Sequence, residues 1–144
     1  AFDLADADLE QRGRALVSLR DRLIEGIREN VGHATLTGHA TQRLVGHVSV
    51  CFDFIEGEAA LLYLAIKGIA ASSGSTCSSK ALKASHVLTS IGISAELAQG
   101  SIVMSLGTDN TVEQIDFTVS SMAEVMKKLR EMSPLYAKWR KENE

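Results

Sequence analysis

The sequence is poor in proline, cysteine, aromatic residues and net charge, each of which can indicate a particular class of protein. Its 144 residues include one proline, two cysteines and 5% aromatic residues, and its net charge is only −3. A chain with so little excess charge lacks the basic surface that binding to nucleic acid requires. The longest apolar run, residues 59–66, is far shorter than the roughly 20 residues that span a bilayer. We therefore expect no nucleic-acid partner and no membrane-spanning segment.

The two cysteines, Cys51 and Cys77, form no CxxC pair, and the chain shows no signal-peptide pattern. Disulfides are rare in reducing compartments, so we expect a cytoplasmic protein with free thiols. The chain begins at Ala1 without a methionine and runs directly into a helical pattern. This start is typical of a fragment or a processed product.

Apolar residues at helical spacing predict two long amphipathic helices, over about residues 4–30 and up to about Met132. The second begins with a capping box, in which Thr111 is the N-cap and Gln114 occupies the third helical position. Shorter helices are expected over residues 56–67 and after Ser85, which has a side chain suited to an N-cap.

The residues after Pro134 predict a tail helix that packs Leu135, Tyr136 and Trp139 against the body of the protein.

Alternating apolar and polar residues predict a half-buried strand over residues 47–54, with Cys51 on the face opposite Phe52. The same alternation predicts a strand over residues 101–106, where Val103 is the apolar exception on the polar face. Two shorter strands are expected, at residues 34–37 and 68–72.

This order of elements predicts an α+β fold, in which helices cover a small, mostly antiparallel sheet and a long linking helix precedes it. Residues 1–144 are expected to form a single domain. Within it, residues 1–31 are the linking helix, 32–132 the α+β part with an active-site loop at 72–84, and 133–144 the tail helix.

Cys77 is the candidate nucleophile, because it lies in a serine-rich loop followed by Lys80, Lys83 and His86. Nearby cations favour the thiolate, which is the reactive form of the side chain. The alternative is a free cysteine in a surface loop with no role. Cys51, on a predicted strand, is interpreted as a small buried hydrophobic residue.

The four histidines form no pattern of zinc ligands, so no metal site is predicted.

Five consecutive motifs resemble one enzyme family. They are "TGHATQRL" (37–44), "VSVCFDFIEGEAALL" (48–62), "GIAASSGSTCSS" (68–79), "SHVLTSIG" (85–92) and "SIVMSLGTDNTVEQID" (101–116). In this order they resemble the C-terminal small domain of NifS/IscS-type cysteine desulfurases, which are fold-type I pyridoxal phosphate enzymes of aminotransferase class V. The resemblance extends from about Leu9 to Lys141.

The resemblance implies that the full enzyme takes sulfur from L-cysteine, leaves L-alanine, and holds the sulfur as a persulfide on Cys77. Ser73, Gly74, Ser75 and His86 would support the loop that carries this cysteine. The implied partner is an iron–sulfur scaffold or another sulfur-accepting protein.

The resemblance also implies that pyridoxal phosphate binds a large domain that precedes this chain in such enzymes. No lysine here stands in the family's Ser-x-His-Lys setting, so we expect no cofactor-binding residue in this chain and no activity from it in isolation. The missing domain is then a required partner. Without it, the apolar stripe of the first helix would be exposed, so we expect a homo-oligomer.

Val103 departs from the family pattern, because the family has an arginine there that binds the substrate carboxylate. This substitution keeps two alternatives open. One is a non-catalytic persulfide carrier or interaction module, and the other is a desulfurase or selenocysteine lyase relative with an altered substrate.

Overall fold

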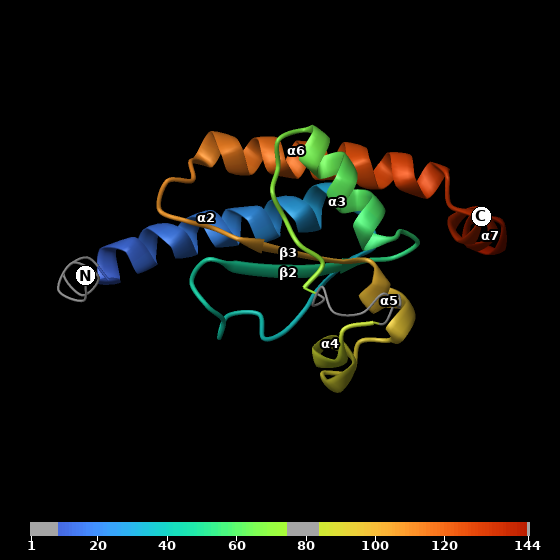
Figure 1. Ribbon diagram of the computed structural model, residues 1–144, viewed down its shortest axis with the longest axis horizontal. Coiled ribbons are helices and arrows are strands. Elements are labelled where there is room, and N and C mark those ends of the chain that lie inside the picture. The colour runs from blue at the N-terminus through green and yellow to red at the C-terminus, as the bar shows by residue number, and fades with distance from the viewer. Residues whose placement is uncertain (1–8, 75–83, 144) are drawn as a thin grey trace.

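The computed structural model describes residues 9–74 and 84–143 (Figure 1). Its elements, in chain order, are α2 (Leu9–Asn30), β1 (Ala34–Leu36), β2 (His47–Phe52), α3 (Gly57–Ile66), α4 (His86–Ser90), α5 (Ala95–Gln99), β3 (Ser101–Ser105), α6 (Val112–Glu131) and α7 (Pro134–Asn143).

The three strands form one antiparallel sheet in the order β1-β2-β3. Cys51 in the central strand is opposite Thr35 on one side and Ser101 on the other. With helices packed on this sheet, the structure confirms the predicted α+β class.

Helices α2 and α6 cover one face of the sheet, and α3 lies beside α6 (Figure 1). Gly26 allows the two long helices to approach closely, because a Cβ atom there would lie 2.7 Å from Cγ2 of Val119. Nearby, Arg22 joins the helices through two parallel hydrogen bonds of 2.7 and 2.8 Å to the carboxylate of Asp116. The predicted capping box starts α6, with reciprocal bonds between Thr111 and Gln114.

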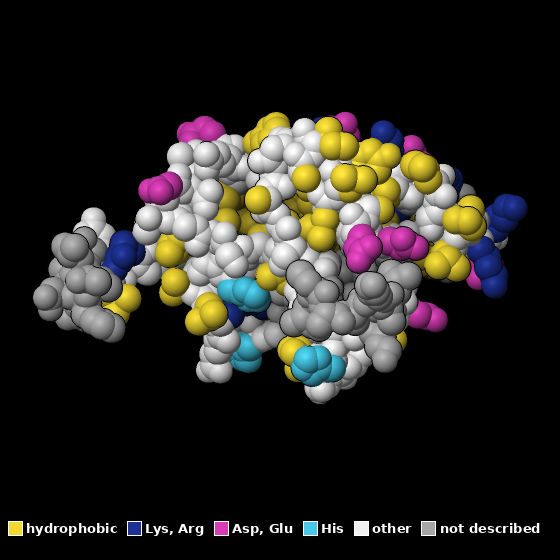
Figure 2. Space-filling view, in the orientation of Figure 1, with side chains coloured by type: hydrophobic (Ala, Val, Ile, Leu, Met, Phe, Trp, Pro, Cys, Tyr) yellow, Lys and Arg dark blue, Asp and Glu magenta, His cyan; other side chains and the backbone are white. Residues whose placement is uncertain are grey.

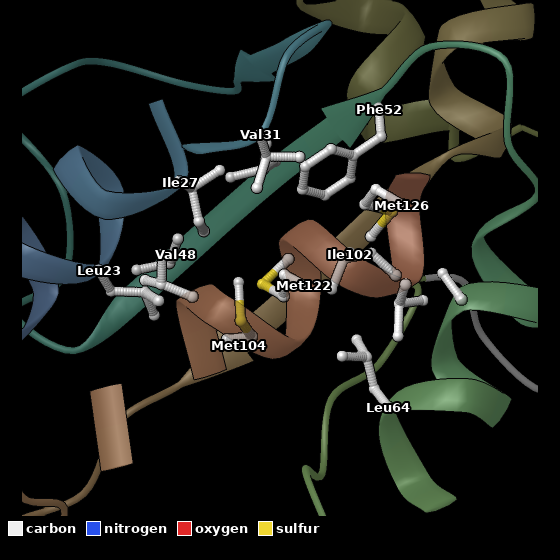
Figure 3. Packing of buried hydrophobic residues seen from close by; sticks show 14 of the residues in the cluster. Leu23, Ile27, Val31, Val48, Phe52, Leu64, Ile102, Met104, Met122 and Met126 are labelled. Atoms are coloured by element: carbon white, nitrogen blue, oxygen red, sulfur yellow. The ribbon is translucent and has the colours of Figure 1, made fainter. Parts of the chain in front are cut away.

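The main core lies between this helical layer and the sheet. Figure 3 shows side chains of α2, α6, β2 and β3 meeting there, and the buried set includes Leu23, Ile27, Val48, Phe52, Ile102, Met104, Met122 and Met126. Outside the core, Figure 2 shows apolar side chains gathered where α3 lies, and Leu62 and Ile66 of that helix are largely exposed.

The opposite face of the sheet is covered by the short helices α4 and α5 (Figure 1). There Cys51 packs with Leu88 and Ala98. Strand β2 is therefore buried on both faces, and the prediction of a half-buried strand was wrong. Its alternating side chains contribute to two hydrophobic clusters, a large one on the α2 and α6 side and a small one that contains Cys51, Leu88 and Ala98.

Two further predictions were wrong in part. Residues 68–72 form no strand, and only Ser72 makes an isolated bridge, to Val103. In the tail helix, Tyr136 and Trp139 pack with Phe54 as predicted, but Leu135 points to solvent and is 69% exposed.

Gly100 occupies the tightest glycine position described. A Cβ atom there would lie 2.1 Å from the carbonyl oxygen of Phe52, and the amide of Phe52 donates a 3.0 Å hydrogen bond to the Gly100 carbonyl. Only glycine allows β2 and the start of β3 to come this close.

We predict that Gly100→Ala lowers the free energy of unfolding by about 3 kcal/mol, because the added methyl group forces two backbone segments apart. Gly107→Ala is the matched control: a Cβ atom at Gly107 meets nothing within 4 Å, so its effect should stay within about 0.5 kcal/mol. Urea unfolding of both variants measures the difference. Equal stability of the two would contradict this account.

Candidate functional site

The predicted active-site loop leaves the sheet beside β3. Ser72 and Val103 exchange two backbone hydrogen bonds, from the Ser72 amide at 2.9 Å and from the Val103 amide at 2.6 Å. The hydroxyl of Ser101 donates a further bond of 2.7 Å to the carbonyl of Ser73. Three hydrogen bonds therefore hold the residues before the loop against the edge strand.

Gly74 is the last described residue before the loop, and it lies against Val103. Its φ of +68° is in the left-handed region, and a Cβ atom there would lie 3.0 Å from Cγ2 of Val103. A larger residue would meet both the strained backbone angle and the valine side chain. Gly74 thus occupies a position that favours glycine, and its role in supporting the loop stays a prediction.

Val103 also has a partner across the sheet. It pairs with Ser49 of β2, whose hydroxyl accepts a 2.7 Å hydrogen bond from Thr37. Three residues that pair with Val103 or lie against it are thus Ser49, Ser72 and Gly74. None of Ser49, Ser72 and Gly74 carries the positive charge that binding a carboxylate would need.

The chain is described again from Ala84, where it enters α4. Ser85 is the N-cap residue as predicted, but its side chain makes no capping hydrogen bond. His86 is exposed on the first turn, and its carbonyl accepts a 3.1 Å bond from the hydroxyl of Thr89. Ser73 and Gly74 thus lie together at the β3 edge, whereas His86 begins a separate helix. Ser75 and Cys77 lie outside the described residues.

Cys51 is a poor nucleophile. Its side chain is fully buried, and this burial, followed by the charge of Asp53, raises the pKa of the thiol to about 11. Near neutral pH the thiol therefore stays protonated. The structure confirms the interpretation of Cys51 as a buried hydrophobic residue.

The described residues do not fit a pyridoxal phosphate site. A cofactor lysine needs a sheltered position, but none of the described lysines is buried, and the least exposed, Lys67, is bonded to Glu124 at 2.7 Å. Nor does the part of the chain described here contain a buried side-chain nitrogen or oxygen that lacks a hydrogen-bond partner.

Residues 9–74 and 84–143 contain no cluster of three His, Cys, Asp or Glu side chains that could hold a metal ion. None of the helices in these ranges combines the length and apolarity needed to cross a bilayer.

Sequence reasoning missed several features that shape this site. It did not predict α5, where the hydroxyl of Ser94 accepts a 3.2 Å bond from the amide of Leu97. It also placed Ser49 and Ser101 on an open polar face, although both are buried. Ser94, a serine directly before a short apolar segment, could have indicated the start of α5. The burial of Ser49 and Ser101 could not be predicted in this way, because it depends on tertiary packing.

Known proteins similar to this chain point to one family. The model of the class-V aminotransferase family matches residues 2–117. The cysteine desulfurase IscS of Methanosarcina thermophila is 49% identical over 96% of the chain, and that of Clostridium botulinum is 41% identical over all of it. The solved structure of a NifS-like protein superimposes on 88% of the chain with a TM-score of 0.74 and 26% identity.

These matches cover only part of each relative. The chain spans 34% of the Methanosarcina enzyme, 37% of the Clostridium enzyme and 31% of the NifS-like structure. The resemblance inferred from the motifs is confirmed, and the chain belongs to the class-V aminotransferase family, with a sequence of the NifS/IscS type.

Proposed function

We propose that this chain is the C-terminal part of a pyridoxal-phosphate-dependent cysteine desulfurase. The observation that carries the proposal is the near-complete match of the chain to enzymes named cysteine desulfurase. In this proposal L-cysteine gives up its sulfur, L-alanine is released, and Cys77 holds the sulfur as a persulfide. An iron–sulfur scaffold or another acceptor protein then takes it.

The cofactor supplies the electron-withdrawing chemistry, and we propose that residues outside this chain hold it. This chain contributes the thiol and its attachment. The three hydrogen bonds at Ser72, Ser73 and Ser101 support this role, because they hold one end of the Cys77 segment against a rigid strand. A free thiol is required throughout, so we place the protein in a reducing cytoplasm.

Val103 favours a second candidate, a persulfide carrier or a desulfurase with another substrate. Its apolar side chain packs on Gly74, and an arginine clamp is worth about 1.5–3 kcal/mol as a charge-assisted hydrogen bond. Loss of that energy weakens carboxylate binding roughly tenfold to a hundredfold. A persulfide carrier binds no amino acid, so valine at this position would not weaken its function.

We predict that Cys77→Ala abolishes cysteine-dependent alanine formation when the chain is part of a protein that also supplies the cofactor-binding domain. Cys51→Ala is the matched control and should keep most of the activity, because that thiol is buried and protonated. Alanine is measured by amino-acid analysis. Full turnover by the Cys77 variant would remove its assigned role, and no turnover by the parent would favour the carrier.

Val103→Arg distinguishes a cysteine desulfurase that has lost its carboxylate-binding arginine from a protein with another function or substrate. If the protein is a desulfurase weakened by valine, the arginine should lower KM for L-cysteine by about tenfold, with a smaller effect on kcat. Val103→Leu is the control, since it adds bulk without charge. No change in KM with Val103→Arg would argue that the protein does not recognise the cysteine carboxylate at this position.

The two thiols should also differ in reactivity. With a pKa of about 11, only about a thousandth of Cys51 is thiolate at pH 8. Iodoacetamide at pH 8 should therefore label Cys77 in the folded protein and Cys51 only after denaturation, as read by peptide mass spectrometry. Equal labelling of Cys51 in the folded and unfolded protein would contradict its burial.

A further inference from the structure

The short helices α4 and α5 form a layer of their own. Residues 84–99, which we call the cover, lie on the face of the sheet opposite α2 and α6 (Figure 1). The side chain of Cys51 is fully buried beneath them. The described residues of the main core and the three hydrogen bonds at the β3 edge all lie outside the cover. The strength of its own attachment therefore decides whether Cys51 stays buried.

The two helices of the cover are firmly joined to each other. Helix α4 ends in a Schellman motif, in which the amide of Ile93 donates a 3.0 Å hydrogen bond to the carbonyl of Leu88. The amide of Gly92 donates the second bond of the motif, at 3.1 Å, to the carbonyl of Thr89. Gly92 has the φ of +90° that this turn requires. The cover is thus one piece that moves as a unit.

Few contacts attach the cover to the sheet. In the described part of the chain the small cluster has three buried members, Cys51, Leu88 and Ala98, and two of them belong to the cover. The hydrogen bonds of residues 84–99 within that part join these residues to one another, and none of them reaches the sheet. The attachment therefore depends on the packing of a few apolar side chains.

A pocket of about 660 Å³ lies on one side of α5. Ser94, Glu96 and Leu97 line it from the cover, and Trp139 lines it from α7. Because the side chains there border open space, they lose part of the dispersion contacts that close packing would give. This side of α5 therefore adds little to the attachment of the cover.

The cover also has little stability of its own. Helices α4 and α5 have five residues each, far fewer than the roughly 12 that an isolated helix needs in water. Ser85 makes no capping hydrogen bond with its side chain, and Val87 and Ile91 of this region are more than half exposed. Segments with few buried apolar contacts open at a lower free energy than the whole protein unfolds.

The cover has a sharp boundary at Gly100. The carbonyl of Gly100 accepts a 3.0 Å hydrogen bond from the amide of Phe52, and Ser101 begins β3 directly afterwards. The chain is therefore fixed to the sheet at residue 100 and held only by the small cluster before it. Movement at this boundary leaves the pairing of β2 with β3 intact.

We propose that the cover opens transiently as a unit while the sheet and the main core stay folded. Cys51 reports on this opening, because its thiol becomes accessible only when Leu88 and Ala98 move away. Opening also moves Ala84, where the chain continues from the segment that carries Cys77. If the proposed function holds, this movement extends the reach of that segment toward an acceptor protein; the opening itself does not depend on that function.

Slow labelling of Cys51 measures the opening. Brief labelling leaves this thiol unmodified, so the folded chain is kept in excess iodoacetamide at pH 8, with and without urea below the unfolding transition. Mass spectrometry follows the Cys51 peptide. We expect labelling over hours, against minutes for the unfolded chain, with less than about half of the urea dependence of global unfolding. The full urea dependence, or no labelling, would overturn the proposal.

Two neighbouring residues of α4 provide a matched pair of variants. Leu88→Ala removes the larger side chain by which the cover packs on Cys51, and should speed the labelling of Cys51 at least about tenfold. Val87→Ala shortens a side chain that is 58% exposed, and should change the rate less than about twofold. Equal rates for the two variants would contradict an opening controlled by Leu88.

Ile27→Val separates opening of the cover from global unfolding. Ile27 is buried in the main core, so the lost methyl group lowers global stability but should leave the labelling rate of Cys51 in the absence of urea unchanged. If labelling accelerates by the same factor as the global unfolding constant, the proposal fails. Circular dichroism checks that Leu88→Ala folds, and the Ile27 variant keeps the test valid if it does not. The measurement needs no turnover, so its failure would leave the proposed function standing.

Discussion

The antiparallel pairing of β2 with β3 is the interaction on which the rest of the structure depends. Both strands are covered by α2 and α6 on one face, and β2 is covered by α4 and α5 on the other. Gly100 permits the close contact at one end of this pair, and Gly46 does the same at the other, where a Cβ atom would lie 2.6 Å from the Leu106 carbonyl. Two glycines thus permit the close pairing of the strands on which α2, α3 and α5 pack.

The same strand pair supports the proposed chemistry. The N–H and C=O of Val103 both bond Ser72 at the outer edge of β3, while its neighbours Ile102 and Met104 pair with β2. The segment leading to Cys77 therefore starts from a fixed edge. A thiol that must meet a substrate and then a partner benefits from a firm attachment at the base of its segment. The apolar contact between Val103 and Gly74 belongs to this attachment, which gives valine a packing role at the position where the resemblance implies an arginine.

Much of this fold could be predicted from hydrophobic periodicity, because α2, α6, β2 and β3 are long enough to show their pattern. Helix α5 is too short for this, and the bridge at Ser72 depends on a strand about thirty residues later. Arg130 follows Met126 by one helical turn, so its place on the buried stripe was visible, but its charge argued for exposure. Cys77 could be identified from the residues around it in the sequence motif, and its proposed chemistry rests on the family resemblance.

The central claim is that Cys77 carries sulfur taken from L-cysteine, and peptide mass spectrometry tests it most directly. A protein that joins this chain to a cofactor-binding domain is incubated with L-cysteine, trapped with an alkylating agent and digested without reductant. The account predicts one added sulfur atom on the Cys77 peptide and none on the Cys51 peptide. Cysteine turnover with no added sulfur on Cys77 would contradict it.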